Sequence, residues 1–153
     1  MSAFRTSLIA FAAIAASSLY ATSATATAQS AVALLYGGNE IDGATGKANA
    51  GDTNGYGIAT VSVVSRDKIC FTLFVIRIGA PTAAHIHVAP PGVNGGVVIP
   101  LTPVPGSGNP GTSSGCVAGD PKVIAKIRKK PDQFYVNVHN KRYPAGAIRG
   151  QLF

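Results

Sequence analysis

The sequence predicts an all-β protein, an antiparallel β-sandwich with one short helix, and three observations support this prediction. Short segments in which apolar and polar residues alternate recur along the chain from residue 31 to the C-terminus. Glycine and proline make up 28 of the 153 residues, which is typical of a fold with many turns. Glutamate occurs only once, so the chain lacks the residues from which coiled coils and helix bundles are built. The length suits one domain.

The N-terminus has the composition of a targeting segment. The apolar stretch Leu8–Leu19 follows the single charge of Arg5 and is too short to span a bilayer. Ala26-Thr27-Ala28 then has the small-x-small form of a signal-peptidase site. We therefore expect residues 1–28 to be a secretory signal peptide and residues 29–153 to be a secreted domain without a transmembrane segment. The alternative for the apolar stretch is a buried helix.

The chain contains two cysteines, Cys70 and Cys116. Two cysteines are too few for a Cys₄ zinc site or a disulfide-dense mini-protein. Because export leads to an oxidising compartment, we expect them to form a disulfide. The alternative is an enzyme with a free thiol, which is the weaker hypothesis because no histidine lies near either cysteine in the sequence.

The alternating and apolar segments predict a series of short strands. They are residues 31–36, 56–65, 68–78, 83–88, 97–101, 133–139 and 147–153. Segment 68–78 has apolar residues on both faces, so we expect a central strand that is buried on both sides. Residues 37–55, and the stretch from residue 102 to Cys116, are rich in turn residues and are expected to be loops.

One helix is predicted to begin at Pro121 and to end before Pro131. Asp120 can cap it, and proline is favoured at a first helical position. Apolar residues then lie on one face of this helix. The other face carries four lysines, Lys122, Lys126, Lys129 and Lys130.

The three histidines of the chain fall in two of the predicted strands. His85 and His87 are two residues apart, so their rings leave the same face of a strand. If the strand that carries His139 is a neighbour, three ring nitrogens can converge on one ion. Three neutral nitrogens with an open position suit copper or zinc, in a mononuclear site.

A structural role for the histidines is the alternative. Paired strand histidines can bond to backbone carbonyls or pack on Tyr135, and Asn137, Arg149 and Gln151 offer partners for a polar network. No acidic residue lies between residues 78 and 119 to orient a ligand. Both interpretations therefore stay open.

The chain carries a net charge of +7, and its basic residues gather after residue 120. We expect no nucleic-acid partner, because export separates the protein from nucleic acid and basic residues are not interleaved with aromatic ones. An anionic surface such as an acidic glycan, a wall polysaccharide or lipid headgroups fits the charge better. The alternative is a solvated face that keeps the protein soluble.

Three motifs carry a resemblance to a known family. The segments AAHIHVAPPGVNGGVVIPL (83–101) and PDQFYVNVHNKRYPAGAIRGQL (131–152) are similar to two sequence blocks of the CHRD domain, the module named after chordin. The stretch LLYGGNEIDG (34–43) is similar to its opening, except that IDG replaces the usual VPP. The resemblance covers residues 31–153, and the family's two cysteines match Cys70 and Cys116. It implies an immunoglobulin-like sandwich in an extracellular protein. The growth-factor binding of chordin itself is not carried over.

Together these observations predict a secreted CHRD domain that acts as an extracellular binding module, with a candidate copper or zinc site at His85, His87 and His139. The first alternative is a copper-dependent enzyme like superoxide dismutase, because the His-x-His strand resembles the copper-binding strand of Cu,Zn superoxide dismutase. In that case Arg149 would guide an anion such as superoxide. The second alternative is a module without metal that binds an anionic surface or an extracellular protein through its basic helix.

Overall fold

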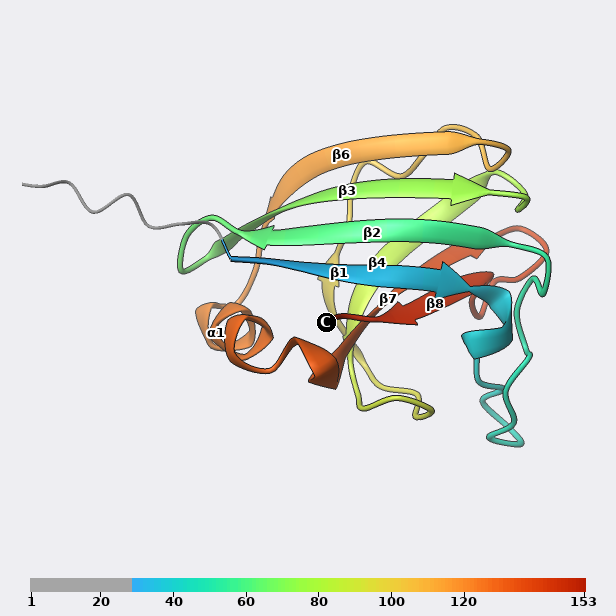
Figure 1. The fold of residues 1–153 in the computed structure, drawn as a ribbon, viewed down its shortest axis with the longest axis horizontal. Helices are drawn as coiled ribbons and strands as arrows, with labels where there is room; N and C mark the ends of the chain where they lie inside the picture. The colour runs from blue at the N-terminus through green and yellow to red at the C-terminus, as the bar shows by residue number, and fades with distance from the viewer. Residues whose placement is uncertain (1–28) are drawn as a thin grey trace, which may run out of the picture.

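The computed structural model describes residues 29–153, in which eight strands form one antiparallel sheet (Figure 1). The strands are β1 (Gln29–Tyr36), β2 (Tyr56–Val63), β3 (Lys68–Ile76), β4 (Pro81–Val88), β5 (Val97–Pro100), β6 (Gly111–Ala118), β7 (Phe134–Asn140) and β8 (Ile148–Gln151). Their order across the sheet is β5-β4-β7-β8-β1-β2-β3-β6. The sheet curls until its two edge strands, β5 and β6, contact each other. The two layers of the sandwich are therefore parts of one sheet that is almost a barrel.

The hydrophobic core fills the inside of this curled sheet. Leu35 of β1 and Leu73 of β3 meet Ile86 of β4 and Ile99 of β5 there, and all four side chains are fully buried. Because side chains of a strand alternate between its faces, every second residue points into this core. Burying side chains of this size contributes about 1.5–3 kcal/mol each.

The helix α1 (Pro121–Lys129) closes one end of the sheet and confirms the predicted helix. The Asp120 carboxylate accepts a hydrogen bond of 2.6 Å from the Lys122 amide, and Pro121 is the first helical residue. Ile124 and Ile127 are buried against the core. The four lysines of the other face are exposed. A short 3₁₀ turn, η2 (Pro131–Gln133), follows, and η1 (Gly37–Asn39) follows β1.

The structure confirms the predicted fold class and all seven predicted strands, with boundaries shifted by up to two residues. An eighth strand, β6, was expected to be a loop. Its sequence GTSSGCVA lacks the apolar alternation of a half-buried strand, yet it pairs with β3 over its full length. The hydrogen bonds that hold β6 extended come from the neighbouring strand β3. This pairing depends on the tertiary structure and cannot be predicted from the local sequence of β6.

The prediction for β3 was wrong in one respect. Ile69, Phe71, Leu73 and Val75 are buried, but the opposite face of β3 is open to solvent, and Phe74 on that face is 39% exposed. β3 lies second from the sheet edge rather than at its centre. The apolar residues on both faces of β3 predicted burial on both sides. The structure shows instead that those on the outer face form part of an exposed apolar surface.

The disulfide between Cys70 and Cys116 is confirmed, and no cysteine is left free for a thiol enzyme among residues 29–153. The two residues are direct partners in the register of β3 and β6. The predicted signal peptide, residues 1–28, lies outside the described residues. Within them, none of the helices has the length and hydropathy needed to cross a membrane.

We expect removal of the disulfide to destabilise the fold. The double variant Cys70→Ala with Cys116→Ala should lose about 2–4 kcal/mol of unfolding free energy, because the bridge restricts a long loop of the unfolded chain. Chemical denaturation of both proteins measures this loss. The control is Thr72→Ala with Ser114→Ala, the adjacent pair on the same strand faces, which should change stability by about 0.5 kcal/mol or less. Equal losses in both double variants would contradict the prediction.

Candidate metal centre

The pairing of β4 with β7 brings the three histidines together. In the antiparallel register of these neighbours, Ala83 faces His139, His85 faces Asn137 and His87 faces Tyr135. Directly paired residues project from the same face of a sheet. The three rings therefore gather on the outer face of the curled sheet, on the side opposite the core.

The ring nitrogens are close enough for one ion. His85 Nδ1 and His139 Nε2 are 3.1 Å apart, and one nitrogen from each of the three rings lies within 4.8 Å of the others. Two nitrogens bound to one tetrahedral ion at about 2.0–2.1 Å are about 3.3 Å apart. The pair of His85 and His139 already has this spacing, and His87 needs only a small side-chain movement to complete it.

Backbone carbonyls determine which nitrogen of two rings carries the proton. His87 Nδ1 lies 2.9 Å from the Gly95 carbonyl oxygen, and His139 Nδ1 lies 3.0 Å from that of Pro144. A carbonyl oxygen only accepts hydrogen bonds, so each Nδ1 must donate. The lone pair of each ring is then on Nε2, which is how metal-binding histidines are commonly oriented. That of His139 accepts the hydrogen bond from His85 Nδ1, whereas that of His87 has no partner.

The Nε2 atom of His87 is buried and has no hydrogen-bond partner. A buried acceptor without a partner costs about 1–3 kcal/mol of folding free energy. The burial also lowers the pKa of His87, and it lowers those of His85 and His139 in the same way. All three rings are therefore neutral at pH 7, which is the form that binds metal.

Tyr135 holds the His87 ring in place from the neighbouring strand. The two rings are stacked, with centroids 4.7 Å apart and planes within 9° of each other. On the side of β8, the Arg149 guanidinium carbon lies 3.4 Å from the Tyr135 ring centroid. Tyr135 is thus flanked by a histidine from β4 and an arginine from β8. The contacts expected of structural histidines, with carbonyls and with Tyr135, are therefore present, and they leave the Nε2 lone pair of His87 without a partner.

The loop of residues 89–96 covers this side of the site. The Gly95 carbonyl in this loop orients His87, a role that the sequence did not reveal. A side chain at Gly95 would overlap the Val88 carbonyl, so the close approach requires glycine. The Tyr135 hydroxyl accepts a 3.2 Å hydrogen bond from the Gly95 amide and fixes the loop.

Arg149 lies beneath that loop and is only 2% exposed. Its guanidinium donates to the Val93 carbonyl at 2.6 Å and to Asn94 Oδ1 at 2.9 Å. In this position Arg149 supports the loop and the aromatic stack. An anion-guiding role stays a prediction, and Arg149 would exert it through its field rather than by direct contact. Gln151 bonds to the Ala89 and Asp132 carbonyls, away from the histidines.

Glu40 is a residue of the site region that sequence reasoning did not select. It is 3% exposed, and its Oε1 accepts a 2.7 Å hydrogen bond from Nδ2 of Asn137, the residue that faces His85. Burial raises the pKa of Glu40 from 4.5 to about 7, although the Arg149 charge and the Asn137 bond act in the opposite direction. The signal in the sequence was that Glu40 is the single glutamate and lies within a motif shared with the family.

Gly146 leaves room for this buried carboxylate. Its φ is +148°, and a Cβ there would lie 2.5 Å from Glu40 Oε2 and 2.6 Å from Asn137 Nδ2. A side chain at this position would therefore displace the Glu40–Asn137 pair, which lies beside the histidines on the same face of the sheet.

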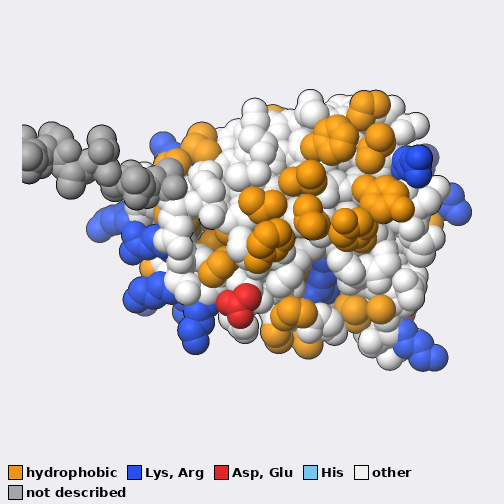
Figure 2. Space-filling model, in the orientation of Figure 1, with side chains coloured by type: hydrophobic (Ala, Val, Ile, Leu, Met, Phe, Trp, Pro, Cys, Tyr) orange, Lys and Arg blue, Asp and Glu red, His pale blue; other side chains and the backbone are white. Residues whose placement is uncertain are grey.

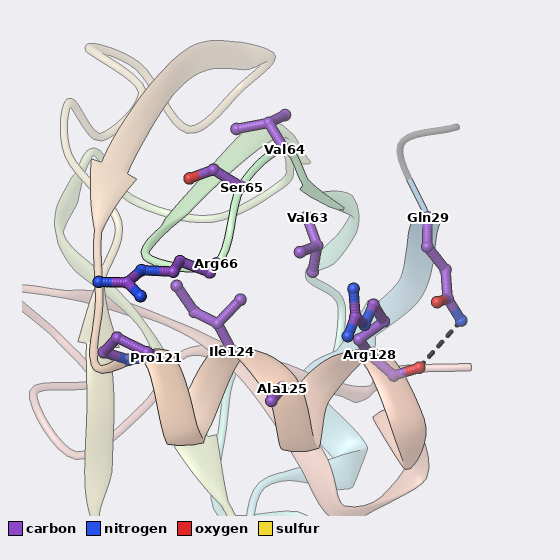
Figure 3. A pocket seen from close by; sticks show the side chains of 9 residues that line it. All are labelled: Gln29, Val63, Val64, Ser65, Arg66, Pro121, Ile124, Ala125 and Arg128. Atoms are coloured by element: carbon purple, nitrogen blue, oxygen red, sulfur yellow. Dashed lines mark hydrogen bonds between the residues drawn. The ribbon is translucent and has the colours of Figure 1, made fainter. Parts of the chain in front are cut away.

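The basic helix α1 lies apart from the histidines. An open groove of about 620 Å³ separates α1 from the turn between β2 and β3, and Arg66 and Arg128 line it (Figure 3). Its apolar floor includes Val63 and Ile124. None of the three histidines lines this groove, so the helix and the candidate metal centre are separate surfaces.

The buried Glu40 predicts an unusual pH dependence of stability. Native Glu40 holds its proton more tightly than the unfolded chain does, so its ionisation destabilises the fold as the pH rises from about 4.5 to 7. Glu40→Gln cannot ionise but keeps an acceptor for Asn137. Relative to wild type, this variant should gain about 3 kcal/mol of unfolding free energy between pH 4.5 and pH 8. Denaturant titrations across this range provide the test, and a difference that does not change with pH would contradict it.

Comparison with protein-family models gives one match, the CHRD domain, over residues 31–152. Comparison with curated proteins and with solved structures gives no significant match. The matched region holds all eight strands, the disulfide and the three histidines, apart from the first two residues of β1. The match extends over nearly the whole described chain, and it supports an extracellular type of module. The chain belongs to the CHRD domain family.

Proposed function

We propose that this protein is a secreted CHRD module that binds one copper or zinc ion through His85, His87 and His139. The buried Nε2 of His87 is the observation that carries the proposal, because its lone pair lacks a donor and its ring belongs to a cluster in which one nitrogen of each histidine lies within 4.8 Å of the others. A metal ion would satisfy this atom. No other polar group of the described residues bonds to it.

The chemistry of the donor set supports copper or zinc. Neutral imidazoles suit Cu(II) and Zn(II), whereas magnesium and calcium require oxygen ligands. Two of the three rings are anchored through Nδ1 to carbonyls, so binding through Nε2 needs no change of tautomer there. His85 donates from Nδ1 to His139 in the absence of metal and would release that hydrogen bond to bind the ion.

The site would keep a position open to a further ligand. His85 and His139 are only half-buried, so the cluster is accessible from solvent. Three protein ligands with an open fourth position are typical of catalytic as well as transport sites. Superoxide chemistry of a copper-loaded form stays a prediction of the sequence, and the three histidines allow only a mononuclear version of it.

We expect the protein to bind one equivalent of Cu(II) or Zn(II) with a dissociation constant below about 1 μM. Each of His85→Ala, His87→Ala and His139→Ala should weaken binding by at least about 100-fold, because two ligands hold an ion far less well than three. Isothermal titration calorimetry of the metal-free proteins measures the dissociation constants of wild type and of each variant. Thr82→Ala, an exposed residue of the same strand β4, is the matched control and should bind as wild type does.

The chain has no histidine outside this cluster, so it contains no other imidazole that could account for binding. Binding that survives all three substitutions, or the absence of any binding, would contradict the proposal. The histidines would then be structural. If copper binds, a superoxide dismutation assay of the loaded protein distinguishes a catalytic site from a non-catalytic one.

A second candidate function is attachment to an anionic polymer through α1. This candidate rests on the exposure of Lys122, Lys126, Lys129 and Lys130 together on one helix face. Arg128 and Arg66 lie along the adjoining groove and add to the positive potential. A surface of this kind attracts anions over about a Debye length, so the attraction weakens in salt.

We expect the triple variant Lys126→Glu, Lys129→Glu and Lys130→Glu to elute from an immobilised heparin column at much lower salt than wild type. The matched control reverses three exposed charges elsewhere, at Lys47, Lys141 and Arg142. Because both triple variants have the same net charge, a specific helix surface predicts a smaller change in the control. Equal shifts would indicate that only the net charge matters.

A further inference from the structure

An apolar patch covers the outer face of β1, β2 and β3. The register places Leu34, Ile58 and Phe74 side by side in one row across the three strands. Tyr36 and Tyr56 lie side by side in the next row, with ring centroids 5.5 Å apart. These five large side chains are each between 39% and 46% exposed.

The strands that carry the patch, and the adjacent strand β6, have almost no charge on this face. Among the outward positions of β1, β2, β3 and β6, all within the described part of the chain, Lys68 at the far end is the only charged residue. Most of the others beyond the patch are serine or threonine. Figure 2 shows the hydrophobic side chains gathered over this face, while most Lys and Arg side chains lie at the two ends of the molecule.

The patch has complementary halves. An open hollow of about 570 Å³ lies on its β3 and β6 side, lined by Ile58, Phe74 and the hydroxyl residues Thr72, Thr112 and Ser114. The tyrosine pair lies on the β1 and β2 side. A two-fold axis through the patch would place the tyrosines of each copy over the hollow of the other. Isologous dimers require such self-complementarity.

We propose that a second copy of this chain covers the patch and forms a two-fold symmetric dimer, sheet face against sheet face. Four strands of about eight residues, at about 3.3 Å per residue and 4.8 Å between strands, present about 500 Å² per copy. The total of about 1,000 Å² is at the lower limit for a specific interface, so the dimer is weak and depends on concentration. The proposed interface has an apolar centre surrounded by hydroxyl side chains, and protein interfaces commonly have an apolar core with a polar rim.

The distribution of charge permits a second copy at this face. Each molecule is strongly basic, and its exposed lysines on α1 would repel those of another copy. The outer face of the β1–β2–β3–β6 half is a surface on which two copies can meet almost without bringing cations together. An acidic partner would instead be expected at α1. The proposal is independent of metal binding, because the patch and the histidines lie on different strands.

The test is analytical ultracentrifugation of the protein from about 1 μM to about 500 μM, which brackets a dissociation constant on the order of 10 μM. We expect the weight-average mass to rise from that of a monomer toward twice that value. The rise should persist in high salt, because the contact is apolar. Ile58→Asp and Phe74→Ser should each remain monomeric over the whole range, while retaining the wild-type circular dichroism spectrum.

The matched control is Val64→Asp, which adds a charge at an equally exposed apolar residue outside the patch, where 45% of Val64 is exposed. This variant should dimerise as wild type does. A wild-type protein that stays monomeric at about 500 μM, or a Phe74→Ser variant that dimerises normally, would overturn the proposal. Co-sedimentation of monomeric protein with insoluble chitin or cellulose, lost in Phe74→Ser, would instead assign the face to a neutral polysaccharide.

Discussion

The pairing of β4 with β7 is the constraint on which the candidate site depends. Its register sets His85 and His87 on the same outer face as His139, although His139 is 54 residues away from His85 in the chain. A slip of one residue in this pairing would turn one set of side chains to the other face. The same register buries Ile86 and Val136 in the core on the opposite side. Core packing and convergence of the histidines therefore have the same cause.

Two loops, rather than the sheet, set the orientation of two histidine rings. The carbonyls of Gly95 and Pro144 orient the two rings that they contact, and both lie in segments between strands. Tyr135 and Arg149 tie the first of these loops to β7 and β8. The result is a cluster of neutral imidazoles with defined tautomers. A cluster that is prepared in this way would bind an ion, as proposed, without a large cost of reorganisation.

A buried carboxylate, Glu40, lies beside the candidate metal site. Glu40 is linked through Asn137 to the position facing His85, and Arg149 lies near enough to favour its charged form. With a pKa of about 7, Glu40 is partly ionised under neutral conditions. A divalent ion bound by neutral ligands adds positive charge to this region and would favour ionisation of Glu40. If a metal ion binds as proposed, its occupancy and the charge state of the carboxylate would be coupled.

The sequence by itself determined the fold class, the seven alternating strands, the capped helix and the shared face of His85 and His87. These features rest on local periodicity and on local capping, which residues near one another in the chain decide. The tertiary structure alone decided that β6 is a strand, that the outer face of β3 is open, and that His139, Gly95 and Glu40 reach the same region. These features depend on which strands are neighbours and in what register. Such long-range pairing leaves no periodic signal in the segments themselves, because the partner strand supplies the hydrogen bonds and the burial.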